Sequence, residues 1–406
     1  MRGNDGEDGI VGGSEVKHLG DITKLNGAEI PVVDCITGGS PCQDLSVAGK
    51  RAGLDGERSG LFMEQIRIVK EMRKKEMENG RTAESVRPRW MVWENVPGAF
   101  SSNGGKDFRA VLTEIVRIVE PECADVPMPK DGRWSKAGCL YDELGRWSVA
   151  WRVHDAQFWG VPQRRKRIAL VADFGGMCAP EVLFERKGLS RNSEQGKKKG
   201  ENSSRDDCSR VKGTISIDGY NQQINYDVTM PLRNKNSDSD HIPIVLESNK
   251  LICVSSSNTN MTISKSEISS PILSRSGTGG NNQPIIIVEP SKIVRKLTPI
   301  ECERLQGFPD GWTDIGEWVD TKGKKHKEAD SPRYKALGNS IATPFWFYLL
   351  RRISATYERP ATLGSLFDGI GGFPYCWERC NGKGAAVWAS EIEEFPIAVT
   401  KIRFPE

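Results

Sequence analysis

Short apolar runs that alternate with helical stretches dominate the chain between residues 16 and 174. Residues 32–36 and 90–93 are typical of buried parallel strands, and residues 167–172 are a further strand candidate. Between the first two runs, a stretch from residue 61 to residue 75 carries apolar side chains near a 3.6-residue period, at Leu61, Ile66, Val69 and Met72. Strands that alternate with helices predict an α/β fold in which the strands are buried and parallel.

The pattern changes after about residue 185. Residues 186–212 hold nine Lys and Arg against four Asp and Glu, and they are rich in Ser and Asn, which predicts a basic loop or linker. Residues 213–290 are dense in Ser, Asn, Thr and Gly. They contain three short runs typical of strands, at residues 242–246, 251–254 and 284–288. This stretch is therefore predicted to form a small, irregular, β-rich domain.

Regular structure is expected again from Leu297, where a helical pattern begins. A further strand is predicted at residues 362–367, and it runs directly into a glycine-rich turn.

Composition sets limits on the class of protein. A length of 406 residues predicts two domains, or one large domain with a smaller partner. The chain contains no stretch of 18 apolar residues, so a membrane span is not expected. The polar first 15 residues do not resemble a secretory signal. Ten scattered cysteines without a Cys-x-x-Cys pair, and only four histidines, favour a reducing cytoplasm and argue against zinc. The net charge of +3 neither requires nor excludes a nucleic-acid partner.

The first chemical feature is the glycine-rich turn at residues 366–374. A strand that ends in Gly369-Ile370-Gly371-Gly372 lets a ligand approach the backbone, and Pro374 suits the first turn of a following helix. Glu391 ends the next predicted strand, about 20 positions later, where nucleotide-binding folds place a ribose-binding acid. An ordinary tight turn is the alternative.

Two further features follow predicted strands, and a third precedes one. Cys42 lies on a loop after residues 32–36, where it is either a nucleophile or a small buried apolar side chain. Glu94 ends the run 90–93 and is either an acid that contacts a ligand or a surface carboxylate. The basic stretch 163–167 is solvated or faces phosphates.

Together these features resemble the cytosine-carbon-5 DNA methyltransferases, which use S-adenosylmethionine. The resemblance covers nearly all of the chain outside residues 1–15 and 186–290. The similar blocks are Pro41-Cys42-Gln43, Glu94-Asn95-Val96, residues 163–167, residues 295–310, Gly338-Asn339-Ser340, residues 367–372, Glu391, and residues 18–22. The implied fold is a Rossmann-like α/β methyltransferase sheet with a smaller, irregular, β-rich target recognition domain.

The resemblance also implies residue roles. Cys42 would add to carbon 6 of a flipped-out cytosine, Glu94 would hold the base at N3 and the exocyclic amine, and Arg165 would lie near the base carbonyl. Asn95 is expected to fix the loop geometry. The implied cofactor-binding residues are Phe367, Gly369, Gly371, Gly372, Glu391, Ile392, Asp21, Ile22, Pro41, Asn339 and Ser340. The implied DNA-binding residues are Gln43, Ser46, Arg165 and Arg167.

The order of the blocks departs from the family. The glycine turn and the ribose acid usually come first, whereas here they follow Asn339-Ser340, so the order is that of a circular permutation. The strand at 363–367 is then expected in the middle of the sheet, beside the strand at 32–36. The expected division is a flexible tail at 1–15, catalytic parts at 16–185 and 361–406, a target recognition domain with its basic linker at 186–290, and a bracing segment at 291–360.

A smaller departure concerns the glycine turn itself. The family often has an acid two residues before the phenylalanine, but this chain has Ser365 there, and Asp368 follows Phe367 instead.

The expected protein is a monomeric, cytoplasmic enzyme that methylates double-stranded DNA, with a role in restriction–modification or in a phage. Three alternatives stay open. They are a non-catalytic DNA-binding relative, a tRNA methyltransferase of the same superfamily, and a cysteine hydrolase built on Cys42. The long variable region favours duplex DNA over RNA, and no histidine follows close to Cys42, which argues against the hydrolase.

Overall fold

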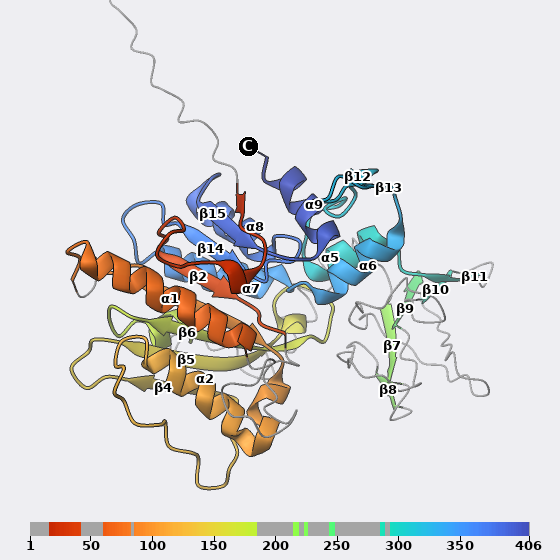
Figure 1. The fold of residues 1–406 in the computed structure, drawn as a ribbon. Helices are drawn as coiled ribbons and strands as arrows, with labels where there is room; N and C mark the ends of the chain where they lie inside the picture. The colour runs from red at the N-terminus through yellow and green to blue at the C-terminus, as the bar shows by residue number, and fades with distance from the viewer. Residues whose placement is uncertain are drawn as a thin grey trace, which may run out of the picture.

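The computed structural model describes residues 16–41, 60–82, 85–184 and 293–405, and four strands within residues 214–288. These residues form an eight-stranded sheet, a five-stranded sheet and a two-stranded hairpin (Figure 1). The strands of the large sheet, in spatial order, are β1 (Lys17–His18), β15 (Ala386–Ser390), β14 (Leu363–Leu366), β2 (Cys35–Gly38), β3 (Trp90–Asn95), β6 (Lys166–Asp173), β5 (Ser148–Asp155) and β4 (Ala137–Tyr141). The predicted α/β class is confirmed.

Strands from distant parts of the sequence alternate in one half of the sheet. β1, β15, β14, β2 and β3 are parallel to one another, and β6, β5 and β4 continue the sheet in antiparallel pairing. β14 pairs with β2 in register from Leu363 opposite Cys35 to Leu366 opposite Gly38. The prediction that this strand lies in the middle of the sheet, beside the strand that leads to Cys42, is therefore confirmed.

An ion pair between a buried carboxylate and a half-exposed arginine joins these two parts of the chain where β2 and β14 begin. Arg359 donates to both carboxylate oxygens of Asp34 at 2.7 Å, and the backbone N–H of Thr362 donates to the same carboxylate at 2.8 Å. Burial opposes the charge of Asp34, but these bonds outweigh it and hold the pKa of the carboxyl below its usual value. The backbone N–H groups of Asp34 and Cys35 both bond to Thr362, so the ladder starts there. This explains why β2 begins at Cys35 and not at Val32 as predicted.

Helices cover both faces of the large sheet (Figure 1). Their bounds are α1 (Gly60–Glu78), α2 (Lys106–Val116), α3 (Ala179–Leu183), α5 (Pro299–Gln306), α6 (Asp330–Asn339), α7 (Thr343–Ser354), α8 (Gly372–Asn381) and α9 (Glu394–Arg403). The predicted helix at 61–75 is confirmed as α1, and the helical pattern from Leu297 as α5.

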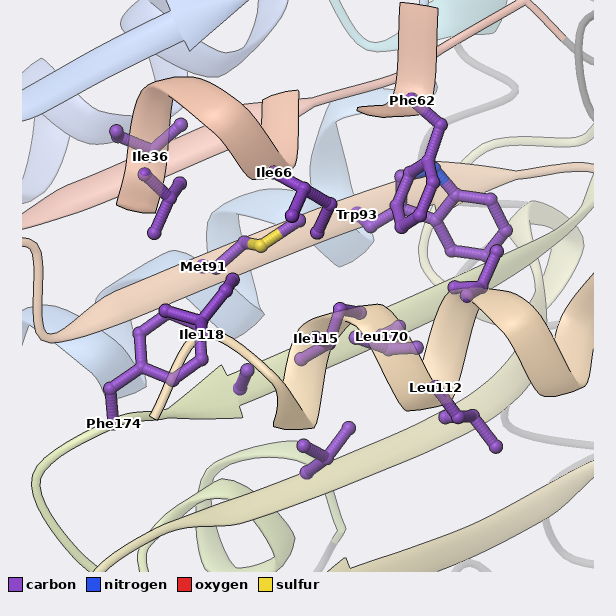
Figure 2. Packing of buried hydrophobic residues seen from close by; sticks show 14 of the residues in the cluster. Ile36, Phe62, Ile66, Met91, Trp93, Leu112, Ile115, Ile118, Leu170 and Phe174 are labelled. Carbon is purple, nitrogen blue, oxygen red and sulfur yellow. The ribbon is translucent and has the colours of Figure 1, made fainter. Parts of the chain in front are cut away.

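The core has two sides because side chains alternate along the central strands. On β3, Met91 and Trp93 face the cluster that contains α1 and α2, whereas Trp90 and Val92 face the cluster that contains α7 and α8. Figure 2 shows the first of these clusters, in which Ile66 of α1 lies over Met91. A strand buried on both faces reads as a continuous apolar run, which is why β3 could be predicted so closely.

The five-stranded sheet has the order β11 (Ile293–Lys296), β10 (Ile285–Val288), β9 (Pro243–Glu247), β7 (Thr214–Asp218) and β8 (Gln223–Asn225). Two of the three runs predicted as strands in this stretch are confirmed, as β9 and β10. The third, at residues 251–254, lies outside the described residues. The two-stranded hairpin pairs β12 (Trp318–Val319) with β13 (Lys325–His326).

Two strands of the large sheet were not predicted from the sequence. β4 lies at the sheet edge, where side chains alternate between exposed and half-buried positions, and β5 contains charged and polar residues among its apolar ones. Among the described helices, none combines the length and apolar character that a bilayer crossing requires.

Removal of residues 361–406 should abolish folding of the large sheet. The truncation deletes the strands β14 and β15 from the interior of the sheet, and Asp34 loses its hydrogen bond from the N–H of Thr362. The core lost with these strands is too large for a protein whose net stability is about 5–15 kcal/mol. Urea denaturation of a fragment comprising residues 1–360, followed by tryptophan fluorescence, measures this. A cooperative transition like that of the full chain would show that the inner strands are dispensable.

Candidate active site

Five chain segments converge at one edge of the large sheet. The carboxyl ends of the parallel strands β15, β14, β2 and β3 all lie at this edge, and β6 runs in the opposite direction, so its first residues lie there too. The topology therefore brings together the residues that follow these strands with the basic stretch that precedes β6. The predicted site residues of the described chain come from these segments and from two neighbouring ones, the loop after β1 and the end of α6.

The glycine-rich turn after β14 has a backbone that side chains rarely allow. Phe367, Gly369 and Gly371 all have positive φ, of 55°, 58° and 80°. A Cβ atom on Gly371 would lie 2.5 Å from the ring of Phe404, so this position also needs glycine for space. The turn leads into α8, whose first backbone N–H groups point back toward it.

Glu391 closes the turn from the end of β15. Its Oε2 accepts a hydrogen bond from the N–H of Gly369 at 2.7 Å, and its Oε1 accepts from the N–H groups of Ile392 at 2.7 Å and Glu393 at 2.9 Å. The side chain of Ile392 is 69% exposed. An acid and an exposed apolar side chain therefore lie side by side next to the glycine turn.

Asp368 is a buried acid within the same turn. Ser365 donates a hydrogen bond to its Oδ1 at 2.5 Å, and Oδ2 is buried without a hydrogen-bond partner among the described residues. Burial raises the pKa of Asp368 to about 7, and the negative charge of Glu391 adds to the rise.

The loop after β1 approaches the turn from the other side of β15. Ser390 donates to the carbonyl of Gly20 at 2.6 Å, which holds this loop beside β15. Asp21 caps the short 3-10 helix η1 (Ile22–Lys24) by accepting from Thr23, and this bond lowers the pKa of the Asp21 carboxyl. Ile22 itself is buried in the core, so it supports the loop from beneath.

The loop after β2 is held against the end of β3. Trp93 donates from Nε1 to the hydroxyl of Ser40 at 3.1 Å, and Asn95 donates to the carbonyl of Ser40 at 3.0 Å. This agrees with the expectation that Asn95 fixes loop geometry. A Cβ atom on Gly39 would lie 3.0 Å from a carboxylate oxygen of Glu94, so the loop passes directly beside that acid. Pro41 is exposed, and Cys42, Gln43 and Ser46 lie outside the described residues.

The two predicted arginines differ in their surroundings. Arg167 forms an ion pair with Glu94 at 2.7 Å, and both side chains are about one-sixth exposed. Arg165 is 4% exposed and donates to the carbonyls of Ser340 at 2.5 Å and Gly338 at 3.2 Å. Burial lowers the pKa of Arg165 well below its usual value, and the charge of Arg167 lowers it further.

Arg165 therefore ties the basic stretch to the end of α6. Asn339 is the last residue of α6 and is exposed, whereas Ser340 is buried and turns its hydroxyl to Leu337. The junction also contains two side chains that the sequence did not single out for this purpose. Gln163 donates to the carbonyl of Leu305, and Gln306 donates to the carbonyl of Leu337.

One supporting residue was not singled out from the sequence. Gln65 of α1 is fully buried. A Cβ atom on Gly38, the last residue of β2, would lie only 2.5 Å from the Gln65 Oε1, so this side chain packs directly against the end of the strand. A glutamine on the buried face of an otherwise amphipathic helix is the only hint that the sequence offers.

Comparison with known proteins gives one family. The sequence profile described as "C-5 cytosine-specific DNA methylase" matches residues 13–118 and 139–355. A protein named DNA N-6-adenine-methyltransferase, from Escherichia phage P1, is 29% identical over 84% of this chain and 55% of its own length. The type II methyltransferase M2.BsuMI of Bacillus subtilis is 27% identical over 80% of this chain and 61% of its own. The chain thus spans less than two thirds of these curated relatives.

Among solved structures, the S. pombe Dnmt2 methyltransferase is similar, with 14% identity, a TM-score of 0.41 and coverage of 82% of each chain.

Asp368→Asn should stabilise the protein relative to the unchanged chain, and this gain in the free energy of unfolding should be larger at pH 8 than at pH 5. In the folded state Asp368 keeps its proton up to a pH of about 7, but in the unfolded state it ionises near pH 4, so the free energy of unfolding falls as the pH rises between these values. Asparagine keeps the bond from Ser365 and never ionises.

Urea denaturation of both proteins at the two pH values measures this effect, and the expected gain from pH 5 to pH 8 is about 2–3 kcal/mol. An equal difference at both pH values would show that Asp368 is ionised throughout.

Proposed function

Because this chain belongs to the C-5 cytosine-specific DNA methylase family, we propose that it is a DNA methyltransferase that transfers a methyl group from S-adenosylmethionine to carbon 5 of a flipped-out cytosine in double-stranded DNA. The observation that carries the proposal is the convergence of Glu94, the loop that leads to Cys42, and the turn closed by Glu391 at one sheet edge. The reaction needs a nucleophile, a base-binding acid and a cofactor site within reach of one another.

The residues of the glycine turn fit S-adenosylmethionine by their chemistry. The first N–H groups of α8 suit a carboxylate, the carboxylate of Glu391 suits ribose hydroxyls, and the unpartnered oxygen of Asp368 suits a nearby cation. Ile392 offers exposed apolar surface for an adenine ring, and Asp21 lies on the adjoining loop. The cofactor supplies a methyl group on a positively charged sulfur, which makes the methyl carbon electrophilic.

The base must be activated before it can accept the methyl group. The thiolate of Cys42 would add to carbon 6, and the electron pair of the 5,6 double bond would then attack through carbon 5. Glu94 would stabilise the added base by hydrogen bonds to N3 and the exocyclic amine. Loss of the carbon-5 proton to a base and expulsion of the thiolate restore the double bond. The target must leave the helical stack to reach these groups, at a cost of a few kcal/mol.

We assign the arginine at the base to Arg167 in preference to Arg165. Arg167 already contacts the acid that would bind the base, whereas the guanidinium of Arg165 is directed to backbone carbonyls at the end of α6. Arg165 then acts as a positioning residue that connects the catalytic edge to Ser340. A base that enters the site would share Glu94 with Arg167, whose charge is suited to the base carbonyl oxygen.

DNA contacts and sequence choice are proposed for the remaining parts. The lysines and arginines of residues 186–212 would neutralise phosphates, and the polar side chains of residues 213–290 would read base edges. Gln43 and Ser46, beside the nucleophile, would contact the DNA strand that carries the target. The enzyme would serve DNA modification in a restriction–modification system or a phage.

The proposal includes a circularly permuted motif order. Support comes from β14 and β15, which follow Asn339-Ser340 in sequence but lie between β1 and β2 in the sheet. Val16 and Phe404 belong to one buried cluster, so the segment that leads into β1 and the segment that follows α9 are neighbours. This is the arrangement expected if the family's blocks are all present once with a different starting point.

Adenine-N6 methylation is a second candidate, because the phage P1 relative bears that name. Methyl transfer to an exocyclic amine nitrogen needs no covalent attack at carbon 6, so the two reactions differ in their need for Cys42.

Expression in a host that lacks DNA methylation, followed by hydrolysis and mass spectrometry of plasmid DNA, should reveal 5-methylcytosine. Cys42→Ser should abolish it, because a hydroxyl at neutral pH is a far weaker nucleophile than a thiolate, while DNA binding in a mobility-shift assay should survive. Sequencing of the methylated plasmid identifies the target. N6-methyladenine that persists in the Cys42→Ser variant would establish the second candidate instead.

Arg167→Gln should lower the single-turnover methylation rate by roughly 10²–10³-fold, the typical effect of removing a charge-stabilising donor. Some loss of thermal stability is expected, because the mostly buried Glu94 loses its ionic partner, so the rates are compared at a temperature at which both proteins are folded. Arg165→Gln is the matched control, and it should lower the unfolding temperature because two buried carbonyls lose their donor. An Arg167→Gln protein with the full rate would return the role to Arg165.

A further inference from the structure

Two acidic side chains share the glycine turn without a basic partner. Asp368 precedes Gly369 in the turn, and the N–H of Gly369 donates a hydrogen bond to Glu391. Burial raises the pKa of Asp368, and the negative charge of Glu391 raises it further. Among the described residues, neither carboxylate forms an ion pair with a lysine or arginine. Such an arrangement destabilises the doubly charged turn, because like charges in a desolvated site oppose each other.

The hydrogen bonds around Asp368 leave one position open. Ser365 of β14 satisfies Oδ1, and the backbone N–H of Asp368 donates to Ser390 of β15, so the residue is fixed at both ends. Oδ2 has no donor and is shielded from solvent. Of the other acids on the surrounding elements, Asp21 accepts from Thr23 and lies near Lys24, Glu393 pairs with Lys335, and Glu394 accepts from Thr321, so none of them contacts Asp368.

The proposed cofactor brings the cation that the turn lacks. The sulfonium sulfur of S-adenosylmethionine is bonded to the 5′ carbon of the ribose whose hydroxyls Glu391 would bind. A ribose on Glu391, which binds the N–H of the residue after Asp368, would therefore bring a fixed positive charge to the same turn. The attraction favours the ionised form of Asp368 in the bound state.

We propose that Asp368 is a positioning residue of the cofactor turn, which holds a proton in the free enzyme and releases it when the cationic cofactor binds. The proton passes from the Asp368 carboxyl to solvent, and the resulting carboxylate balances the sulfonium charge. After methyl transfer the thioether product is neutral at sulfur, so Asp368 takes the proton back and the turn holds the product less tightly. This inference rests on the proposed function, because it requires that S-adenosylmethionine binds at Glu391.

Calorimetry of S-adenosylmethionine binding at pH 6 and pH 8 tests the inference. For the unchanged protein, the affinity should weaken roughly ten-fold from pH 8 to pH 6, because a protonated Asp368 must first ionise. Asp368→Asn, which keeps the hydrogen bond from Ser365, should remove this pH dependence of the affinity. The cofactor's own amino group titrates near pH 8 as well, but it is common to both proteins and cancels in the comparison.

Two further measurements separate charge from structure. S-adenosylhomocysteine lacks the sulfonium charge. The ratio of its affinity at pH 8 to its affinity at pH 6 should therefore differ by less than two-fold between the unchanged protein and Asp368→Asn. Repeating the titration at pH 7 in buffers of different ionisation enthalpy should detect proton release with S-adenosylmethionine that is absent in Asp368→Asn. A structural role alone would weaken both ligands equally at every pH and release no proton.

Glu391→Ala distinguishes failure of the inference from failure of the proposed function. It should weaken S-adenosylmethionine binding about ten- to a hundred-fold at both pH values, through loss of the hydrogen bonds to ribose. No binding of the cofactor to the unchanged protein would refute the proposed function. Binding that depends on Glu391 but shows the same pH ratio with and without Asp368 would refute the proton release and leave the function intact.

Discussion

Parallel pairing of β14 with β2 is the constraint on which the rest of the structure depends. Parallel strands present their carboxyl ends at one edge, so this single pairing places the glycine turn after β14 beside the loop that leads to Cys42. β3 adds Glu94 at the same edge, and the reversed direction of β6 adds Arg167. Without the pairing, the proposed cofactor turn and the proposed nucleophile would belong to separate parts of the protein.

Polar contacts, more than apolar ones, fix both ends of β2. Asp34 with Arg359 sets where β2 and β14 start, and at the catalytic edge Asn95 with Ser40 sets where the chain leaves β2. Each contact satisfies a group that would otherwise be costly to bury, so a shift of one residue in register would leave several groups unpaired. Apolar packing alone tolerates such shifts more readily, and it is therefore the polar contacts that give the edge its defined geometry.

The sequence predicted those features that depend on local pattern. Trp90–Trp93 is apolar because β3 is buried on both faces, and Gly371 is glycine because Phe404 occupies the space of a side chain, so both were recognisable. The features that were missed depend on contacts between distant residues. Neither the direction of Arg165 toward Ser340 nor the burial of Asp368 follows from its neighbours in sequence. Edge strands such as β4, whose side chains alternate only between exposed and half-buried positions, carry too little local signal.

The place of β14 and β15 in the sheet has a consequence for how the chain is made. A ribosome synthesises β1, β2 and β3 long before residues 363–390, so during that interval the facing edges of β1 and β2 have no neighbour. Unpaired strand edges bind to one another between chains, and pairings of long sequence separation form slowly. The nascent protein must therefore pass through an aggregation-prone stage that ends only when its last two strands enter the sheet. A chain whose inner strands are made first would not have this exposed interval.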